Sequence, residues 1–278
     1  MLIGQVLQRA KIEPTEVEIF LSCLLGKDRS FIKAFPEFKL KKRQIAKLKE
    51  FIKRRKKSEP LAYILGYQEF CGHIFKVDGR VMIPRPETEN LVAEVIKHVY
   101  AQPNRSLRNS PAERGQYSRA LRPLRGLRNS ADHWQADQLK IVDVGTGCGN
   151  IAICLAHAVP FAKIYAVEKD RQAYRLAREN IADHIVSKQV ELIVGDLLEP
   201  INEPVDIIAA NLPYIPSSRF PTLEPEIRDW EPRVALDGGS DGLELYRCLF
   251  AQARRVLKPT SLIFYELDGQ TYISNMKS

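Results

Sequence analysis

The spacing of apolar residues divides the chain into regions with different predicted structure. Over residues 1–57 the apolar positions recur at helical intervals, as in IGQVLQRA and VEIFLSCLLG, which predicts helices. Gly26 stands where one of these helices should end. Residues 61–84 carry aromatic and β-branched residues interrupted by glycines, a pattern typical of a β-hairpin. We therefore expect a small helical bundle over residues 1–60 and a hairpin linker over 61–84.

Short apolar runs alternate with amphipathic stretches over most of residues 85–278. The runs LKIVDVG, AKIYAVE, VELIVGD, VDIIAAN and SLIFYEL predict buried strands, and most of the segments between them predict helices. Strands that alternate with helices form a parallel sheet whose two faces are both covered. The prediction is an α/β domain with a Rossmann-like sheet, in which ligands bind beyond the carboxyl ends of the strands.

Residues 102–138 fit neither pattern. The segment contains the near-repeats SLRNS and GLRNS, is rich in Arg, Ser, Asn, Gly and Pro, and has almost no apolar periodicity. Such a composition cannot bury enough apolar surface to offset the entropy of ordering the chain. We expect a disordered insertion, with an arm that binds nucleic acid as the alternative.

Charge is distributed unevenly along the chain. The net charge is +8, but residues 1–60 alone hold 16 Lys and Arg against 7 Asp and Glu. A basic N-terminal unit indicates a negatively charged partner such as RNA, the ribosome or an acidic protein, so weak nucleic-acid contact through these helices is one expectation. A solvated helix face is the alternative.

The cysteines and the hydropathy of the chain limit the classes of protein to which it can belong. The five cysteines are scattered, with no CxxC pair or Cys/His cluster in the sequence, so we expect neither a disulfide framework nor a metal site. No apolar run reaches the length of a membrane span, so no membrane association is expected. A reducing cytoplasm is the expected location.

A glycine-rich turn after the first buried strand is the strongest local signal. In VDVGTGCGN the glycines fall at 145, 147 and 149, just before a predicted helix. Glycines in this place let backbone N–H groups approach a ligand closely. A dinucleotide fingerprint would need its third glycine at position 150, which is Asn150, so the spacing disfavours NAD. A purely structural turn is the alternative.

Polar residues also end the next three predicted strands. Glu168 has the position of an acid that accepts hydrogen bonds from a ribose diol, and the Asp196 carboxylate could accept one from an adenine amino group. Asn211-Leu-Pro-Tyr214 follows the fourth strand. An acceptor oxygen of Asn211 and a neighbouring carbonyl could hold the NH₂ group of an amide or aromatic amine while the Tyr214 ring stacks on its plane. Surface charges and a proline-rich turn are the structural alternatives.

Several motifs together resemble one family. These are AYILGYQEF, IPRPETE, VDVGTGCGNIAI, GDLL, NLPYIP and EPRVALDGGSDGL, and they cover nearly the whole chain outside the insertion. The chain resembles the PrmC (HemK) family of release factor glutamine methyltransferases. The resemblance implies a class I methyltransferase domain behind a substrate-recognising helical bundle. It also implies that S-adenosyl-L-methionine methylates the N5 amide nitrogen of the glutamine in the GGQ motif of class I peptide chain release factors.

The resemblance assigns roles to particular residues. It implies a cofactor site made of Gly145, Thr146, Gly147, Cys148, Gly149, Glu168, Asp196, Leu197 and Asn211. It implies a substrate site made of Asn211, Leu212, Pro213 and Tyr214, with Asn211 and Tyr214 as the catalytic residues and no metal.

The chain departs from the family in three places. Leu212 replaces a proline of the usual NPPY motif, residues 102–138 are inserted, and the chain stops at Ser278, where the family continues with a helix and a final strand pair. Two other functions stay open: an adenine-N6 amino-methyltransferase acting on DNA or RNA, and an inactive remnant that only binds the cofactor.

Overall fold

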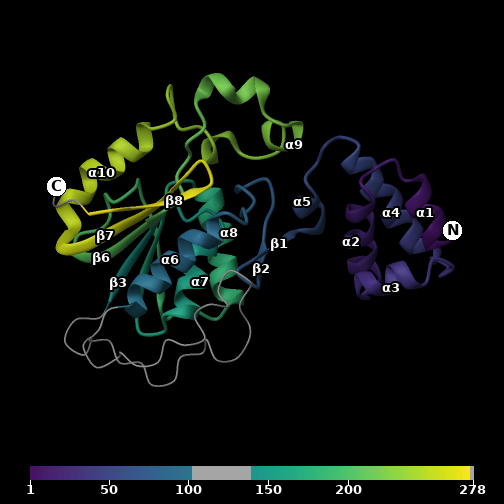
Figure 1. Ribbon diagram of the computed structural model, residues 1–278, viewed down its shortest axis with the longest axis horizontal. Helices are drawn as coiled ribbons and strands as arrows, with labels where there is room; N and C mark the ends of the chain where they lie inside the picture. The colour runs from purple at the N-terminus through teal and green to yellow at the C-terminus, as the bar shows by residue number, and fades with distance from the viewer. Residues whose placement is uncertain (102–138, 276–278) are drawn as a thin grey trace. The chain divides into compact units, whose positions relative to one another are not determined.

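The protein is described by a computed structural model over residues 1–101 and 139–275 (Figure 1). The segment expected to be a disordered insertion, 102–138, lies outside the described residues. The chain divides into two compact units. The first comprises Met1–Gly66 and Glu224–Trp230, and the second comprises Tyr67–Leu223 and Glu231–Ser278. None of the described helices is long and apolar enough to cross a lipid bilayer.

The first unit is helical. Its helices are α1 (Ile3–Arg9), α2 (Pro14–Leu25), α3 (Arg29–Ala34), α4 (Lys42–Arg55), α5 (Leu61–Leu65) and the short α9 (Pro225–Arg228). Gly26 ends α2 with φ of 62°, a left-handed conformation that glycine adopts without steric cost, so the predicted helix stop is confirmed. The apolar faces meet in a core where Phe20 stacks on Phe51 with the ring centroids 4.1 Å apart.

Ion pairs add to this core within the first unit. The Arg55 guanidinium is almost fully buried and donates to the Glu16 and Glu226 carboxylates at 2.6 Å each. Glu226 belongs to α9, which is distant in sequence from the other helices of this unit. Its ion pair with Arg55 therefore holds α9 against the helical bundle.

The expected hairpin is present but shorter than residues 61–84. Leu61–Leu65 is helical, and Gly66 ends that helix in the left-handed region. The hairpin consists of β1 (Tyr67–Phe70) and β2 (His73–Lys76), which pair antiparallel. Sequence reasoning assigned the aromatic and β-branched residues before Gly66 to the hairpin, whereas tertiary packing made them one turn of helix.

The second unit is built on a six-stranded sheet of order β5-β4-β3-β6-β7-β8 (Figure 1). The strands are β3 (Lys140–Val144), β4 (Lys163–Glu168), β5 (Val190–Val194), β6 (Val205–Ala210), β7 (Leu257–Leu267) and β8 (Gln270–Ser274). All neighbours pair parallel except β7 and β8. The flanking helices are α6 (Thr88–Ala101), α7 (Asn150–Ala158), α8 (Arg171–Asp183) and α10 (Glu244–Val256), and two 3₁₀ helices cover Ser217–Thr222 and Arg233–Ala235. The predicted α/β fold class is confirmed.

Alternate residues of β3 show how both faces of the sheet are covered. Asp143 accepts a hydrogen bond from the backbone of α7, so that helix lies on one face. Val142 and Val144 point to the opposite face, where they pack in one cluster with Leu249 and Ala253 of α10. Because the chain runs outward from β3 to β5 and then returns to β6 on the other side, β3 and β6 form a topological switch point.

The strand β8 follows β7 and was not among the strands expected from the sequence. Asp268 and Gly269, with φ of 52° and 74°, form a two-residue turn between Leu267 and Gln270, and β8 returns along β7. Asp-Gly is the residue pair that such a turn favours, because both central positions need positive φ. The sequence signal for this hairpin is Asp268-Gly269 between the runs SLIFYEL and QTYIS.

Candidate functional site

A cavity of about 800 Å³ opens beyond the carboxyl ends of β3, β4, β5 and β6, next to the switch point. Its lining includes most of the residues singled out from the sequence: Gly145, Thr146, Gly147, Cys148, Glu168, Asp196, Leu197, Asn211, Leu212 and Pro213. Gly149 and Tyr214 are outside the lining. The fold therefore brings four strand ends that are far apart in sequence to one site.

The glycine loop leaves open space at Gly147. Gly147 has φ of 58°, and a Cβ added there would meet no atom closer than the Gly145 carbonyl oxygen at 4.0 Å. The Gly145 and Thr146 N–H groups both bond to the Val167 carbonyl, which ties the loop to β4. A ligand can thus approach the backbone at Gly147 without a side chain in between.

Asp143 supports this loop from beneath and was not singled out from the sequence. It is fully buried, and its Oδ2 accepts hydrogen bonds from the Thr146 hydroxyl at 2.5 Å and the Ala152 N–H at 3.1 Å. Burial raises the pKa of Asp143 to about 7, against the lowering effect of these two hydrogen bonds. The sequence signal is an acid inside an otherwise apolar strand, which calls for a specific partner.

Glu168 braces the same loop. Its Oε2 accepts from the Gly147 N–H at 2.9 Å, and its Oε1 accepts from the Asp170 N–H at 2.8 Å. Burial raises the pKa of Glu168, and the hydrogen bonds from Asp170 and Gly147 oppose that rise. Each carboxylate oxygen has a second lone pair, so the side chain can still accept from a diol in the cavity.

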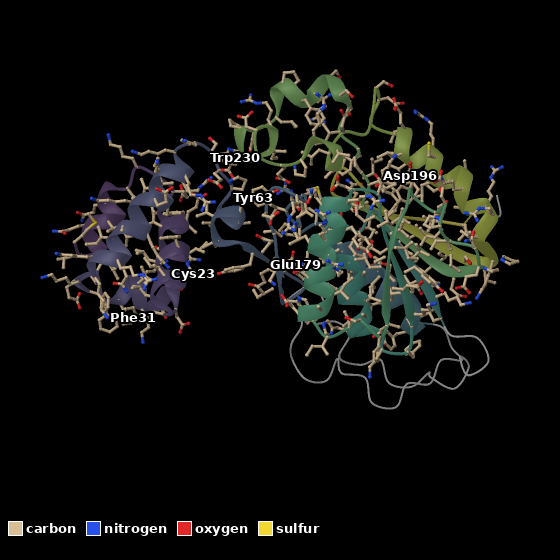
Figure 2. The ribbon with its side chains drawn as sticks, turned by 180° about the vertical axis from the view of Figure 1, so that it is seen from behind. Cys23, Phe31, Tyr63, Glu179, Asp196 and Trp230 are labelled. Carbon is tan, nitrogen blue, oxygen red and sulfur yellow. The ribbon has the colours of Figure 1, made fainter. Side chains whose placement is uncertain are left out.

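Asp196 and Leu197 form the part of the lining that follows β5. Asp196, labelled in Figure 2, pairs with Lys169 at 2.5 Å on the surface, so its carboxylate is already engaged by one cation. Leu197 is buried although its φ is 51°, a left-handed conformation that costs a branched side chain energy. Strain of this kind is concentrated at ligand-binding positions.

Asn211 is held in one orientation by residues from other elements. Its Nδ2 donates to the hydroxyl of Thr88, which is 2 % exposed, over 2.9 Å. The buried Glu266 carboxylate of β7 lies against the Thr88 hydroxyl and the Asn211 amide. Burial raises the pKa of Glu266, and its contacts with these two groups oppose that rise. A carboxylate attracts N–H donors, so the Asn211 amide turns its NH₂ toward this corner and its Oδ1 the opposite way. Sequence reasoning missed Thr88, which lies in the motif IPRPETE, and Glu266, which lies in the apolar run SLIFYEL.

Leu212 occupies the position where the family has proline. Its N–H donates to the buried Tyr246 hydroxyl at 3.1 Å, and that hydroxyl donates to the Glu266 carbonyl. Its side chain packs over the glycine loop, since a Cβ on Gly145 would lie 2.9 Å from Leu212 Cδ2. The Tyr246 hydroxyl is 3.5 Å from the Leu212 carbonyl but has only one proton, so this carbonyl retains acceptor capacity.

A second glycine-rich segment supports the chain after Asn211. A Cβ on Gly238 would lie 2.7 Å from both the Pro213 oxygen and the Tyr214 Cα, so only glycine fits there. The Gly238 N–H donates to the Ile215 carbonyl, and the Ile215 N–H donates to Leu236. The motif ALDGGSDGL therefore acts as a close-fitting backbone support for Asn211–Tyr214. Tyr214 lies just outside the lining, half-buried, and burial raises the pKa of its phenol.

The polar residues of IPRPETE each connect a different segment. Arg85 forms an ion pair with the buried Glu231, whose other oxygen accepts from the Ile83 N–H at 3.1 Å. Thr88 holds Asn211. Glu89 accepts from the Cys71 N–H at 2.8 Å, at the turn of the hairpin. This one motif ties the hairpin and β6 to the segment that begins at Glu231.

The lining has the parts that an adenosyl sulfonium ligand requires. An open glycine backbone can take its polar tail, and a buried acid next to that backbone can take a ribose. Together, the fold and the cavity define an α/β methyltransferase. Residues 129–220 match the family model of the methyltransferase small domain, and residues 3–66 match that of the PrmC N-terminal domain.

Curated relatives give the family. A release factor glutamine methyltransferase of Geobacter sulfurreducens is 37% identical over 253 residues, which cover 91% of this chain and 76% of the relative. One from Caulobacter vibrioides is 33% identical over the same share of both chains. One from Clostridium acetobutylicum is 32% identical over 93% of this chain and 81% of its own length. The chain belongs to the release factor glutamine methyltransferase family.

Proposed function

We propose that this protein transfers a methyl group from S-adenosyl-L-methionine to the N5 amide nitrogen of a glutamine in the GGQ motif of class I peptide chain release factors. Membership of the family supports the substrate class. The observation that carries the chemistry is the fixed Asn211 amide, because its orientation leaves an acceptor oxygen for the NH₂ group of a substrate. When bound, S-adenosyl-L-methionine supplies an electrophilic methyl group on a sulfonium.

The residues of this chain act by positioning. An amide nitrogen is a poor nucleophile because its lone pair is delocalised, so its placement has to provide much of the rate enhancement. Asn211 Oδ1 accepts one N–H of the substrate amide, and the Leu212 carbonyl accepts the other. The Tyr214 ring covers the plane of the amide. As the N–CH₃ bond forms, one N–H proton is lost to solvent, so the product amide is neutral.

Cofactor binding is assigned to the other strand ends. The backbone at Gly147, with Gly145 and Gly149 on either side, takes the amino-acid part of the ligand. Glu168 takes the ribose hydroxyls, and Asp196 and Leu197 lie beside the adenine. The helical first unit, with its exposed lysines on α4, is proposed to recognise the release factor, with weak nucleic-acid contact as a secondary role.

The central test is Asn211→Ala. We expect methyl transfer to a GGQ-containing release factor domain to fall at least 100-fold, because the substrate loses its side-chain acceptor. The dissociation constant for S-adenosyl-L-methionine, measured by calorimetry, should change less than threefold. Asn202→Ala is the matched control, since Asn202 is exposed and its amide donates to the nearby Pro200 carbonyl.

Labelled donor separates the remaining functions. Mass analysis of the GGQ peptide should show one added methyl group on glutamine. Label on adenine of DNA or RNA instead would establish the alternative amino-methyltransferase, and donor binding without transfer to either substrate would identify an inactive remnant.

A further inference from the structure

Three histidines that are far apart in sequence meet in the second unit. His73 begins β2, His157 lies in the last turn of α7, and His184 directly follows α8. One ring nitrogen of each lies within 4.8 Å of the other two. The His73 and His157 rings stack with centroids 4.6 Å apart, and each is 5.7 Å from the His184 ring. None of the three lines the cavity.

We propose that His73, His157 and His184 bind one divalent ion of the Zn²⁺ type, at a site separate from methyl transfer. Imidazole nitrogens suit Zn²⁺, Co²⁺, Ni²⁺ and Cu²⁺, whereas Mg²⁺ and Ca²⁺ prefer oxygen ligands. Within the described ranges no carboxylate or thiol joins this group, so the ligand set is three imidazoles. Three histidines leave the fourth tetrahedral position to water.

A backbone carbonyl next to His184 fixes which of its ring nitrogens can bind a metal. Its Nε2 lies 2.9 Å from the Ile74 carbonyl oxygen, and a carbonyl can only accept. The proton of the neutral ring is therefore on Nε2, which leaves the Nδ1 lone pair for a metal. A backbone carbonyl that fixes the tautomer in this way is the usual partner of a ligating histidine.

The change in geometry on binding is small. Tetrahedral Zn²⁺ with Zn–N distances of about 2.0–2.1 Å sets its ligand nitrogens about 3.3 Å apart. From separations of at most 4.8 Å, each nitrogen has to move by about 1 Å to reach this spacing.

An ion here would join the hairpin to α7 and α8. Asn180 already accepts from the Lys76 N–H at 2.9 Å and donates to the carbonyl oxygens of Lys76 and Cys148. Cys148 belongs to the glycine loop, so the metal would add a second connection between the hairpin and the elements around that loop. The expected role is to stabilise the folded second unit.

The test uses the full chain without an affinity tag. Titration with Zn²⁺ followed by calorimetry should show one equivalent, and saturating Zn²⁺ should raise the melting temperature by several degrees. Co²⁺ should give visible bands of a nitrogen–oxygen site without the near-ultraviolet band of a Co–thiolate bond, which separates this site from the exposed Cys23 and Cys248.

Variants locate the ion. His157→Gln and His73→Gln should each weaken the binding of Zn²⁺ at least tenfold. His98 lies in α6, outside the cluster, so His98→Gln should bind Zn²⁺ as the unaltered protein does. Circular dichroism of the metal-free variants checks that they fold. If only one of the two cluster variants folds, that variant alone is sufficient to test the site. Absence of binding, or equal binding by all three variants, would show that the histidines are only stacked neutral rings.

Discussion

Removing the Thr88 hydroxyl tests whether the orientation of Asn211 limits methyl transfer. Thr88→Val keeps the shape of this buried side chain and removes the acceptor 2.9 Å from Asn211 Nδ2. The amide then loses one of the contacts that distinguish its NH₂ from its oxygen. A flipped amide would present a donor to the substrate NH₂ group, which is itself a donor, and that orientation is unproductive.

The magnitude follows from one hydrogen bond. A neutral intramolecular hydrogen bond contributes about 0.5–1.5 kcal/mol net, so its loss should lower kcat roughly two- to tenfold. Glu266 still faces the amide, and for that reason the effect should stay well below that of Asn211→Ala. The affinity for S-adenosyl-L-methionine should be nearly unchanged, because Thr88 acts on the substrate side of the cavity.

Single-turnover methylation of a GGQ-containing domain, with donor affinity from calorimetry, measures both quantities. Thr88→Ser restores the hydroxyl and should recover most of the rate. Thr222→Val, which removes an exposed hydroxyl bonded to the Arg219 carbonyl, should have no effect. If the Val and Ser variants are equally slow, loss of the hydroxyl alone does not explain the effect, and packing of the Thr88 methyl group matters as well. If neither is slow, the orientation argument is wrong.

Three further perturbations test the supports of the site. Asp143 has a pKa raised from 3.8 to about 7, so its contribution to stability is complete below pH 4 and is lost as pH rises to about 7, a change of about 4 kcal/mol. The melting temperature of the protein relative to Asp143→Asn should therefore fall between about pH 4 and about pH 7, and a constant difference would contradict a buried ionisation. Tyr246→Phe leaves the Leu212 N–H without its acceptor, at a cost of about 1–3 kcal/mol in the free energy of unfolding. The variant should have a lower melting temperature and a lower kcat, and an unchanged kcat would show that this hydrogen bond does not contribute to catalysis. Gly238→Ala places a Cβ 2.7 Å from the Pro213 oxygen, so the melting temperature should drop by several degrees, and a stable, active variant would show that this loop gives way easily.

The sequence by itself determined the fold class and the order of the strand ends that carry polar groups. Short apolar runs and helical periodicity depend on neighbours along the chain, so the parallel sheet and the stop at Gly26 could be predicted locally. The glycine loop and Asn211 could also be recognised, because their chemistry is unusual at the end of a buried strand.

Only the tertiary structure decided which side chains act on those residues. The contacts of Thr88 and Glu266 with Asn211 join segments separated by a long stretch of chain, and local pattern carries no information on such pairs. The same holds for the three histidines, which meet because β2, α7 and α8 pack together. Hydrogen bonding and metal ligation depend on distances of a few ångströms, and packing sets these distances where sequence spacing does not.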